Sequence, residues 1–437
     1  MPSSIIVIGA GIAGLAAAHR LAAQGVNVTV LEAEDRPGGR MSTDMRDGWR
    51  IDRGAQFLSS GYRVIPELIQ QCGLSAQLRL VTPWSATVSS GRIHRLNAHR
   101  PWTLIGSGLF GFMQFARLGW WSALDGLRTR TNPLNDYAAW CDWDDEDAAA
   151  WAVRRFGEKA LEYLFEPMLQ GFYFQSPEET SRALAMLLWN FGTRGTHTMA
   201  LTGGMQMLPQ ALAEGLDVRL STPATKLECR ADGVYVETPQ GCLRGDRVIL
   251  ATTASKARQL YQPDNPAARQ LLETRYSSTI MIGIGLSEGL NVEPVPVDVY
   301  GVLIPRRERR VIAAVAIESR KSPDRVSRGE LLNVMLDGVA GARLVDADEA
   351  DVMAEVLPEL ETWFPGVRRH IGFTHFCRWR EAEPYSPIGR SRVIDVYRKS
   401  CCTDQAVVLA GDYLGIPTTE GAAHSGMWAA DFLLAQI

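Results

Sequence analysis

The first thirty residues contain two apolar runs separated by glycines and alanines. Residues 5–8 are all β-branched, the glycine-rich sequence G-A-G-I-A-G follows at 9–14, and an alanine-rich stretch continues to Leu21. A second apolar run spans 26–31. Short apolar runs bounded by glycine are typical of buried strands, and a longer alanine-rich stretch is typical of a helix. We therefore expect a strand–helix–strand unit at the start of the chain.

The glycine spacing in this unit predicts a dinucleotide site. Gly9 permits a tight turn, Gly11 lets the backbone approach two phosphates, and Gly14 lets the helix pack closely against the strand. The start of the helix faces the anion with free amide groups. Glu32 directly follows the second strand, where an acidic side chain accepts hydrogen bonds from ribose hydroxyls.

A stretch rich in bulky side chains covers residues 102–124. The same glycine spacing recurs there at 106–111, but no buried strand precedes it, so we interpret this copy as helix or loop. Gln114 and Arg117 interrupt the apolar run before it reaches the length of a membrane-spanning helix. Three interpretations stay open: packing within its own domain, contact with a membrane surface, and the wall of an apolar substrate funnel.

The composition indicates a globular enzyme of two domains. The chain has 437 residues, of which 46% are hydrophobic and 22% charged. A net charge of −4 gives no general attraction to nucleic acid, so we expect no such partner. The seven cysteines show no paired metal spacing and the histidines are scattered, so we predict neither a disulfide framework nor a metal site. The first strand leaves no room for a signal peptide, and we expect a cytoplasmic protein, with peripheral membrane contact as the alternative.

Two further sequence motifs resemble those of a known protein family. Gly38-Gly39-Arg40-Met41 follows the acidic residue, and the loop 52–57 reads D-R-G-A-Q-F. Here the chain resembles the flavin-dependent amine oxidase superfamily, which includes monoamine oxidases, protoporphyrinogen oxidases, phytoene desaturases and renalase-like proteins. The resemblance implies that the first motif lies along the FAD pyrophosphate and ribityl chain. It also implies that the G-A-Q loop, similar to the renalase and protoporphyrinogen-oxidase versions, passes beside the isoalloxazine ring.

Later segments follow in the order of the same family. They span 201–209, 220–227, 246–253, 406–412 and 420–426. The resemblance implies a backbone contact of Ala224 with adenine, a contact of Asp412 with a ribityl hydroxyl, and a last helix that begins at the pyrimidine end of the flavin. The residues expected to bind FAD, without a covalent bond, are Gly9, Gly11, Ile12, Ala13, Gly14, Glu32, Ala33, Gly38, Gly39, Arg40, Met41, Gly54, Ala55, Gln56, Phe57, Ala224, Gly411, Asp412, Gly421, Ala422 and Ala423.

The expected fold is α/β. It combines an FAD-binding, Rossmann-like domain of the glutathione-reductase type with an α+β substrate domain built on a mixed sheet. We assign 1–84, 202–266 and 381–437 to the FAD domain, and 85–201 and 267–380 to the substrate domain. The pattern over 148–170 predicts a helix, and the acidic run 144–147 before it is interpreted as the start of that helix rather than a metal site.

The resemblance implies an oxidoreductase that takes a hydride from a small organic substrate onto flavin N5. The expected substrate is an amine, a cyclic imine precursor or a porphyrinogen-like compound, with O2 as acceptor. Alternatives are a renalase-like oxidase of nicotinamide isomers and a flavin-binding protein with a non-redox role. Many amine oxidases of the family carry a lysine on a substrate-domain strand, but no lysine lies between Lys256 and Lys321. No catalytic residue or oligomeric state is assigned; the substrate-pocket candidates are Gln56, Trp379, Tyr385 and His197.

Overall fold

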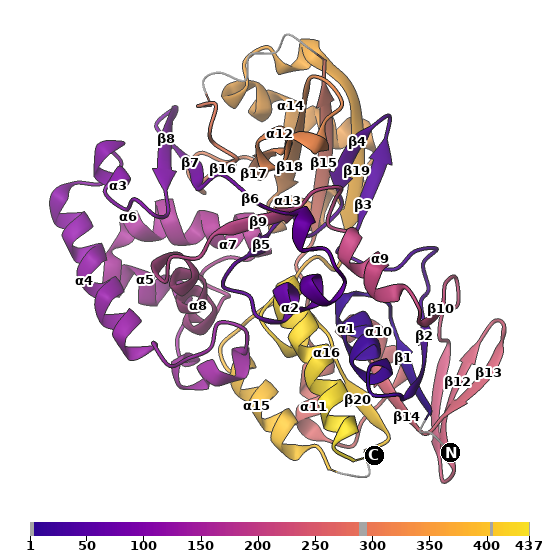
Figure 1. Ribbon diagram of the computed structural model, residues 1–437. Coiled ribbons are helices and arrows are strands. Elements are labelled where there is room, and N and C mark those ends of the chain that lie inside the picture. Colours follow the sequence, from indigo (N-terminus) through magenta and orange to yellow (C-terminus); the bar gives the residue numbers. More distant parts are fainter. Residues whose placement is uncertain (1–3, 288–294, 403–404, 437) are drawn as a thin grey trace.

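The computed structural model describes residues 4–287, 295–402 and 405–436. Figure 1 shows a parallel sheet with α1 (Ile12–Ala22) and α16 (Thr419–Leu434) at the lower right and a larger sheet at the top. A group of helices lies at the left, with α4 (Phe112–Arg128) at its outer edge. The chain passes several times between these parts, so each is assembled from distant segments.

A five-stranded parallel sheet forms the first layer within the described residues. Its order is β10 (Asp217–Arg219), β2 (Asn27–Leu31), β1 (Ser4–Ile8), β14 (Arg247–Leu250) and β20 (Val407–Leu409). Successive side chains of β1 point to opposite faces, so Ile5 and Val7 pack with α1 and α16 while Ile6 and Ile8 join the other core. The expected strand–helix–strand unit is confirmed.

A seven-stranded mixed sheet forms the second layer of the described structure. Its order is β19 (Ile371–Trp379), β15 (Thr279–Leu286), β18 (Glu330–Leu336), β17 (Ile312–Ile317), β16 (Gly301–Leu303), β7 (Trp84–Ser89) and β8 (Arg92–Asn97). The β16–β7 pair is parallel and the other pairs are antiparallel. One face packs with α14 (Glu349–Trp363), and the expected mixed sheet is confirmed.

The helical region corrects one expectation. Residues 148–170 do not form one helix: α5 (Ala148–Phe156) ends at Gly157, whose φ of +94° no helix can continue through. The chain resumes as α6 (Glu158–Ala160), a π-helical turn at 161–165 and α7 (Glu166–Tyr173). The start is as expected, because the carboxylate of Asp147 caps α5 by accepting a hydrogen bond from the amide of Ala150 at 2.7 Å.

The second glycine pattern lies in helix and loop, as interpreted from the sequence. α3 (Thr103–Gly106) is followed by a turn, and Gly111 precedes the first residue of α4. Among the described helices, none is both long and apolar enough to cross a membrane. The remaining elements are β3 (Thr43–Arg46), β4 (Trp49–Asp52), β5 (Leu58–Ser59), β6 (Leu78–Leu80), β9 (Thr198–Leu201), β11 (Lys226–Arg230), β12 (Gly233–Thr238), β13 (Gly241–Gly245), α2 (Val64–Gln71), α8 (Arg182–Thr193), α9 (Met207–Ala213), α10 (Ala254–Leu260), α11 (Pro266–Leu272), α12 (Glu318–Lys321), α13 (Gly338–Leu344) and α15 (Arg390–Ser400).

Candidate active site

A cavity of about 2010 Å³ lies between the two sheets. The segments that follow β1 and β2 line it on one side, and β15, β16 and β17 line it on the other. Sites for one small molecule measure roughly 300–1,000 Å³. The cavity therefore has room for a dinucleotide and a second molecule.

The first glycine loop has the geometry that a pyrophosphate needs. Gly9 adopts a φ of +104°, and its amide donates to the carbonyl of Leu31 at 2.8 Å. A Cβ on Gly14 would lie 1.9 Å from the carbonyl oxygen of Gly9, so only glycine allows α1 to begin there. A Cβ on Gly11 would meet no atom within 4 Å, because this residue faces the open cavity. The loop thus leaves the space beside its backbone that two phosphates would fill.

Glu32 is held at the edge of this loop. One oxygen of its carboxylate accepts from the amide of Ala10 at 2.6 Å, and the other accepts from the amide of Glu34 at 2.9 Å. Burial raises the pKa of Glu32, and these backbone hydrogen bonds oppose that rise. A carboxylate has about four acceptor positions. Glu32 lines the cavity and so keeps acceptor capacity for ribose hydroxyls.

Arg40 and Asp412 meet across the cavity floor. Their Nη1 and Oδ2 atoms lie 2.6 Å apart, and the hydroxyl of Tyr276 donates to the other oxygen of Asp412 at 3.1 Å. Arg40 also donates to the carbonyl of Ala382 at 2.6 Å. The helix α16 begins beside them: Thr419 lines the cavity, and its buried hydroxyl oxygen has no hydrogen-bond partner within the protein. The Arg40 cation suits the pyrophosphate of FAD, and the Asp412 carboxylate suits a ribityl hydroxyl. The unpartnered hydroxyl of Thr419 suits the flavin ring.

Most of the residues expected to bind FAD line this cavity. Gly14, Gly421 and Ala423 do not, because they pack behind the loop and within the first turns of α16. The expected residues that line the cavity are Gly9, Gly11, Ile12, Ala13, Glu32, Ala33, Gly38, Gly39, Arg40, Met41, Gly54, Ala55, Gln56, Phe57, Ala224, Gly411, Asp412 and Ala422.

Three of the four substrate-pocket candidates line the cavity, and the fourth does not. Gln56 lines the cavity but is only 8% exposed, and Trp379 lines it while its indole N–H donates to the carbonyl of Arg53 at 2.6 Å. His197 is exposed at the cavity, and its ring lies 4.5 Å from that of His99. Tyr385 is not among the cavity-lining residues; its ring lies under the guanidinium of Arg275 at 5.0 Å.

The amide of Gln56 is used inside the protein. Its oxygen accepts from Lys321 Nζ at 3.3 Å and from the side-chain amide of Asn333 at 3.1 Å. Its nitrogen donates to the carbonyl of Gly54 at 3.1 Å. These hydrogen bonds hold the side chain of Gln56 against the protein at the cavity wall, and its contact with a substrate stays a prediction.

Behind Gln56 lies a buried charged cluster that sequence reasoning missed. Lys321 Nζ lies 2.9 Å from Asp52 and 2.6 Å from Glu318, and Arg325 Nη1 lies 2.9 Å from the same oxygen of Asp52. Burial raises the pKa of Asp52, but the charges of Lys321 and Arg325 outweigh it and lower the pKa to about 2. The sequence signal for this cluster was that Glu318 and Lys321 come just after the apolar run of β17.

Glu383 is a second residue that the sequence did not single out. It lines the cavity near Arg40 and Asp412. Burial raises its pKa to about 8; Arg40 opposes the rise and Asp412 adds to it. At the cavity-facing side of β15 stands Met281, in the part of the sheet where the sequence lacked a lysine.

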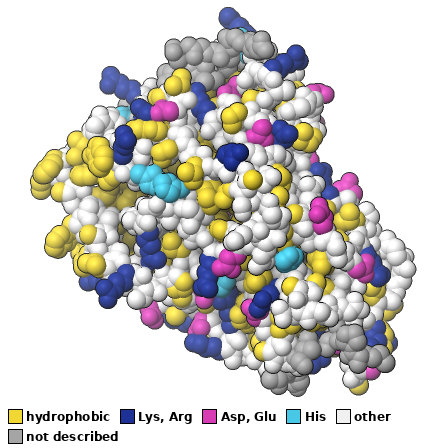
Figure 2. All heavy atoms as spheres, viewed as in Figure 1, with side chains coloured by type: hydrophobic (Ala, Val, Ile, Leu, Met, Phe, Trp, Pro, Cys, Tyr) yellow, Lys and Arg dark blue, Asp and Glu magenta, His cyan; other side chains and the backbone are white. Residues whose placement is uncertain are grey.

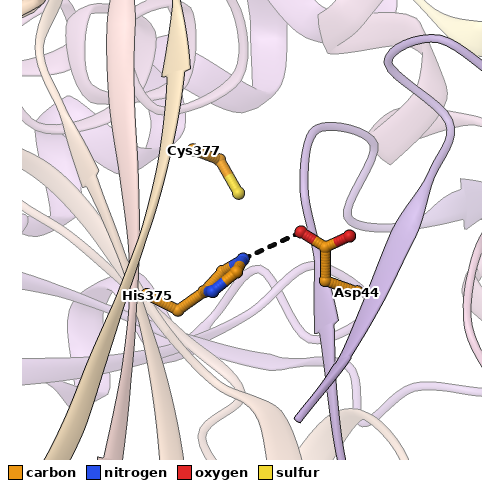
Figure 3. Close-up of side chains that lie close together, drawn as sticks. All are labelled: Asp44, His375 and Cys377. Atoms are coloured by element: carbon orange, nitrogen blue, oxygen red, sulfur yellow. Dashed lines mark hydrogen bonds and ion pairs between the residues drawn. The ribbon is translucent and has the colours of Figure 1, made fainter. Parts of the chain in front are cut away.

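Figure 3 shows three side chains that converge between β19 and β3, where Asp44, His375 and Cys377 bring one ligand atom each within 4.8 Å of one another. His375 Nε2 lies 2.8 Å from Asp44, whose carboxylate also contacts Arg36 at 2.6 Å and Arg53 at 3.4 Å. Burial raises the pKa of Cys377 to about 11 and so keeps its thiol protonated at neutral pH. A metal ion would compete with two guanidinium groups, so the absence of a metal site stays a prediction.

Comparison with known proteins gives consistent results along the whole chain. A coproporphyrinogen III oxidase of Bacillus subtilis is 24% identical over 98% of this chain and 95% of its own length. Protoporphyrinogen oxidase 2 of Arabidopsis thaliana is 21% identical over 99% and 94%. The structure of a putrescine oxidase superposes with a TM-score of 0.80 at 18% identity and covers 100% of this chain and 99% of its own.

The sequence profile of flavin containing amine oxidoreductases matches residues 12–434. Together with the cradle described above, this match identifies FAD as the cofactor and the protein as an FAD-dependent oxidoreductase with a Rossmann-like FAD domain and a substrate domain. The chain belongs to the flavin-containing amine oxidoreductase family.

Proposed function

We propose that the protein dehydrogenates a small organic substrate by hydride transfer to N5 of its FAD, with O2 as the final electron acceptor. The observation that carries this proposal is that one cavity joins the dinucleotide cradle to a chamber roofed by β15, β16 and β17. Bound FAD supplies the two-electron chemistry. The residues of the chain would bind the substrate, orient it and exclude water.

The substrate is proposed to be an amine, a cyclic imine precursor or a porphyrinogen-like compound. Two relatives are named for the oxidation of porphyrinogens, which supports the last class. Met281, rather than a lysine, faces the cavity from β15, which favours a substrate whose product gains conjugation over a typical alkyl amine. Nicotinamide isomers are the alternative oxidised substrates.

We also propose that the FAD is bound without a covalent bond. No cysteine is among the described residues that line the cavity. Precipitation of the protein with acid should therefore release all of the flavin into the supernatant. Yellow colour that stays in the washed pellet would contradict this expectation.

The test of the activity starts from the purified protein and its visible spectrum. Amines, porphyrinogens and nicotinamide isomers are added without oxygen, and the loss of the flavin band is followed. Bleaching by one class, followed by rapid recovery in air, would support the proposed oxidase. A flavin that no compound bleaches, and that stays reduced in air after dithionite, would favour the non-redox role instead.

A second proposal concerns contact with a membrane surface by a cytoplasmic protein. Figure 2 shows hydrophobic side chains gathered on the left, over α3 and α4 of Figure 1. Trp102, Phe112, Met113 and Trp120 are each 61–78% exposed there. Other residues of the same helices line the cavity, so this apolar patch lies beside it. Isolated exposed apolar residues are ordinary, but a group of them marks a contact surface.

Liposome pelleting tests this contact. The double variant Met113→Ser/Trp120→Ser should pellet less with vesicles than the wild type. Val339→Ser is the matched control, because Val339 is 75% exposed but lies on α13. Equal pelleting of all three proteins would count against the membrane proposal.

A further inference from the structure

The cavity is divided into a charged part and an uncharged part. Its charged lining side chains come from the segments around the FAD cradle and from the end of β19. Among the described lining residues from 57–225 and 279–335 there is no Asp, Glu, Lys or Arg, and the histidines there are His99 and His197. Burial, and the neighbouring His197, lower the pKa of His99. Apart from Phe57 and Ala224, which belong to the cradle, these two ranges supply the wall away from it.

The arginines at the end of β19 do not supply charge to this wall. Arg378 donates to the carbonyls of Leu344 and Val345 at 3.3 and 3.0 Å. Arg380 forms an ion pair with Asp346 on the surface. Both residues line the cavity, but the guanidinium group of Arg378 is engaged by backbone carbonyls and that of Arg380 by a surface carboxylate.

The uncharged wall is built from large apolar side chains. Leu104, Phe115, Leu118, Leu188 and Phe191 all line it. The hydroxyl oxygen of Ser122, which also lines it, accepts a hydrogen bond from the indole N–H of Trp189 at 2.9 Å. That hydroxyl is thus engaged by a neighbouring side chain.

A charged group in this chamber would lose its water and, among the described lining residues of this wall, would find no carboxylate, lysine or arginine to pair with. Burying a carboxylate or an ammonium group without a partner carries a large free-energy cost. Putrescine, as a diamine, and coproporphyrinogen III, as a tetracarboxylate, would each place such groups against the wall. A neutral ring or chain would instead gain from the burial of apolar surface.

We infer that the substrate presents an uncharged, apolar skeleton to the chamber, as a lipid-like conjugated or ring compound does. This inference rests on the proposed function, because it narrows the substrate class of the same site. It separates the chain from a diamine oxidase and from an oxidase of polycarboxylate porphyrinogens. Specificity would then arise from the free-energy cost of burying a charged group in the chamber, rather than from one residue that recognises the substrate.

The first test compares two fluorescent probes on the FAD-loaded protein. N-phenyl-1-naphthylamine is neutral, and 8-anilino-1-naphthalenesulfonate has the same ring system with one added sulfonate. Energy transfer from probe to flavin reports binding near the flavin, and displacement of the probe by added neutral compound reports competition for one site. The neutral probe should bind with a Kd at least tenfold lower than that of the sulfonate.

A charge-insertion variant supplies the second test. Gly119 and Gly126 both lie on α4, and a Cβ on either would meet no atom within 4 Å, but only Gly119 lines the cavity. Gly119→Arg should lower the Kd of the sulfonate probe at least tenfold. Gly126→Arg is the matched control and should leave that Kd unchanged.

Three results would overturn the inference. They are equal or tighter binding of the sulfonate by the wild type, no saturable energy transfer from the neutral probe, and faster flavin bleaching by coproporphyrinogen III than by its tetramethyl ester. The probe experiments need no turnover. A failure of the proposed redox function would leave the flavin unbleached by every compound while probe binding is unchanged, whereas a failure of this inference appears in probe binding or in the preference for the charged porphyrinogen over its ester.

Discussion

The ion pair between Arg40 and Asp412 is the residue-scale contact on which FAD affinity should depend most. Asp412→Asn removes the charge that pairs with Arg40 at 2.6 Å and that would accept from a ribityl hydroxyl. Hydrogen bonds to charged groups contribute about 1.5–3 kcal/mol, so we expect the Kd of FAD to rise roughly ten- to hundredfold. Fluorescence titration of the apoprotein with FAD measures it.

The control for this variant is Asp431→Asn. Asp431 pairs with Arg20 at 2.7 Å, but the pair is exposed and neither residue lines the cavity. The Kd of FAD should not change. A similar loss of affinity in both variants would show that Asp412 acts through general stability and not through the cofactor.

The buried cluster around Lys321 should determine stability rather than affinity. Lys321→Met leaves Asp52 and Glu318 with Arg325 as their one remaining cation of the cluster. Breaking a buried ion pair costs about 3–5 kcal/mol, which urea unfolding measures. Lys226→Met, in an exposed pair, should change the free energy of unfolding by less than about 0.5 kcal/mol.

A double variant distinguishes charge from packing in this cluster. Lys321→Met/Glu318→Gln removes one charge of each sign and should recover part of the stability that the single variant loses. If the double variant is as unstable as the sum of the two single changes, the loss comes from packing. The two groups contact each other directly, so a non-additive result is expected.

Single residues could be predicted from the sequence where the local chain carries the signal. Glu32 directly follows β2, and Asp412 is the third residue after β20. The ends of these strands therefore place both side chains. Lys321 and Glu383 could not be found in this way. Their burial depends on contacts with residues 52–56 and with Arg40, which are hundreds of positions away.

At the scale of elements, helix α1 depends on one small residue at its start. A Cβ at Gly14 would lie 1.9 Å from the carbonyl oxygen of Gly9, so Gly14→Ala must displace the helix from the phosphate loop. We expect FAD to be lost and the melting temperature to fall. Gly126→Ala meets no atom and should instead stabilise α4 by about 0.5–1 kcal/mol. A normal flavin content in Gly14→Ala would contradict the packing.

The elements were predicted well where periodicity is local and poorly where it is interrupted. The strand–helix–strand unit at the start of the chain follows from local apolar runs, but the helix expected over 148–170 breaks at Gly157. A helical spacing of apolar residues can continue through a break such as Gly157, because the helices before and after the break can pack against the same core. The parallel pairing of β16 with β7 joins segments about two hundred residues apart and leaves no local signal.

At the scale of the whole molecule, the order of the sheets explains where the site lies. Ligands of parallel α/β sheets bind beyond the carboxyl ends of the strands. In this chain the mixed sheet covers that end, so the space between the two sheets becomes the cavity. The charged side chains of the cavity come from the segments around the FAD cradle and from the end of β19, and the uncharged wall comes from the rest of the covering sheet and from the helices. Under the proposed function, the fold therefore places cofactor and substrate in different parts of one cavity.

The stability of the whole apoprotein should depend on pH through Glu383. Burial raises the pKa of Glu383 from 4.5 to about 8; Arg40 and Arg390 oppose the rise, and Asp412 adds to it. Tyr62 and Tyr173 also face this carboxyl group. Between pH 4.5 and 8 the folded chain holds a proton that the unfolded chain has lost. The stabilisation is complete below pH 4.5 and is lost as the pH rises through 8.

The variant Glu383→Gln isolates this effect, because glutamine resembles the neutral acid and cannot ionise. Wild type and variant should have similar free energies of unfolding near pH 4.5. The wild type should then lose stability relative to the variant by up to roughly 1.4 kcal/mol per pH unit as the pH rises toward 8. Glu237→Gln, in the exposed β11–β12 pair, is the control for removal of a carboxylate outside the cavity. A constant difference between wild type and Glu383→Gln across this pH range would mean that the cavity hydrates this carboxyl group, and that the charged half of the site is open to water in the apoprotein.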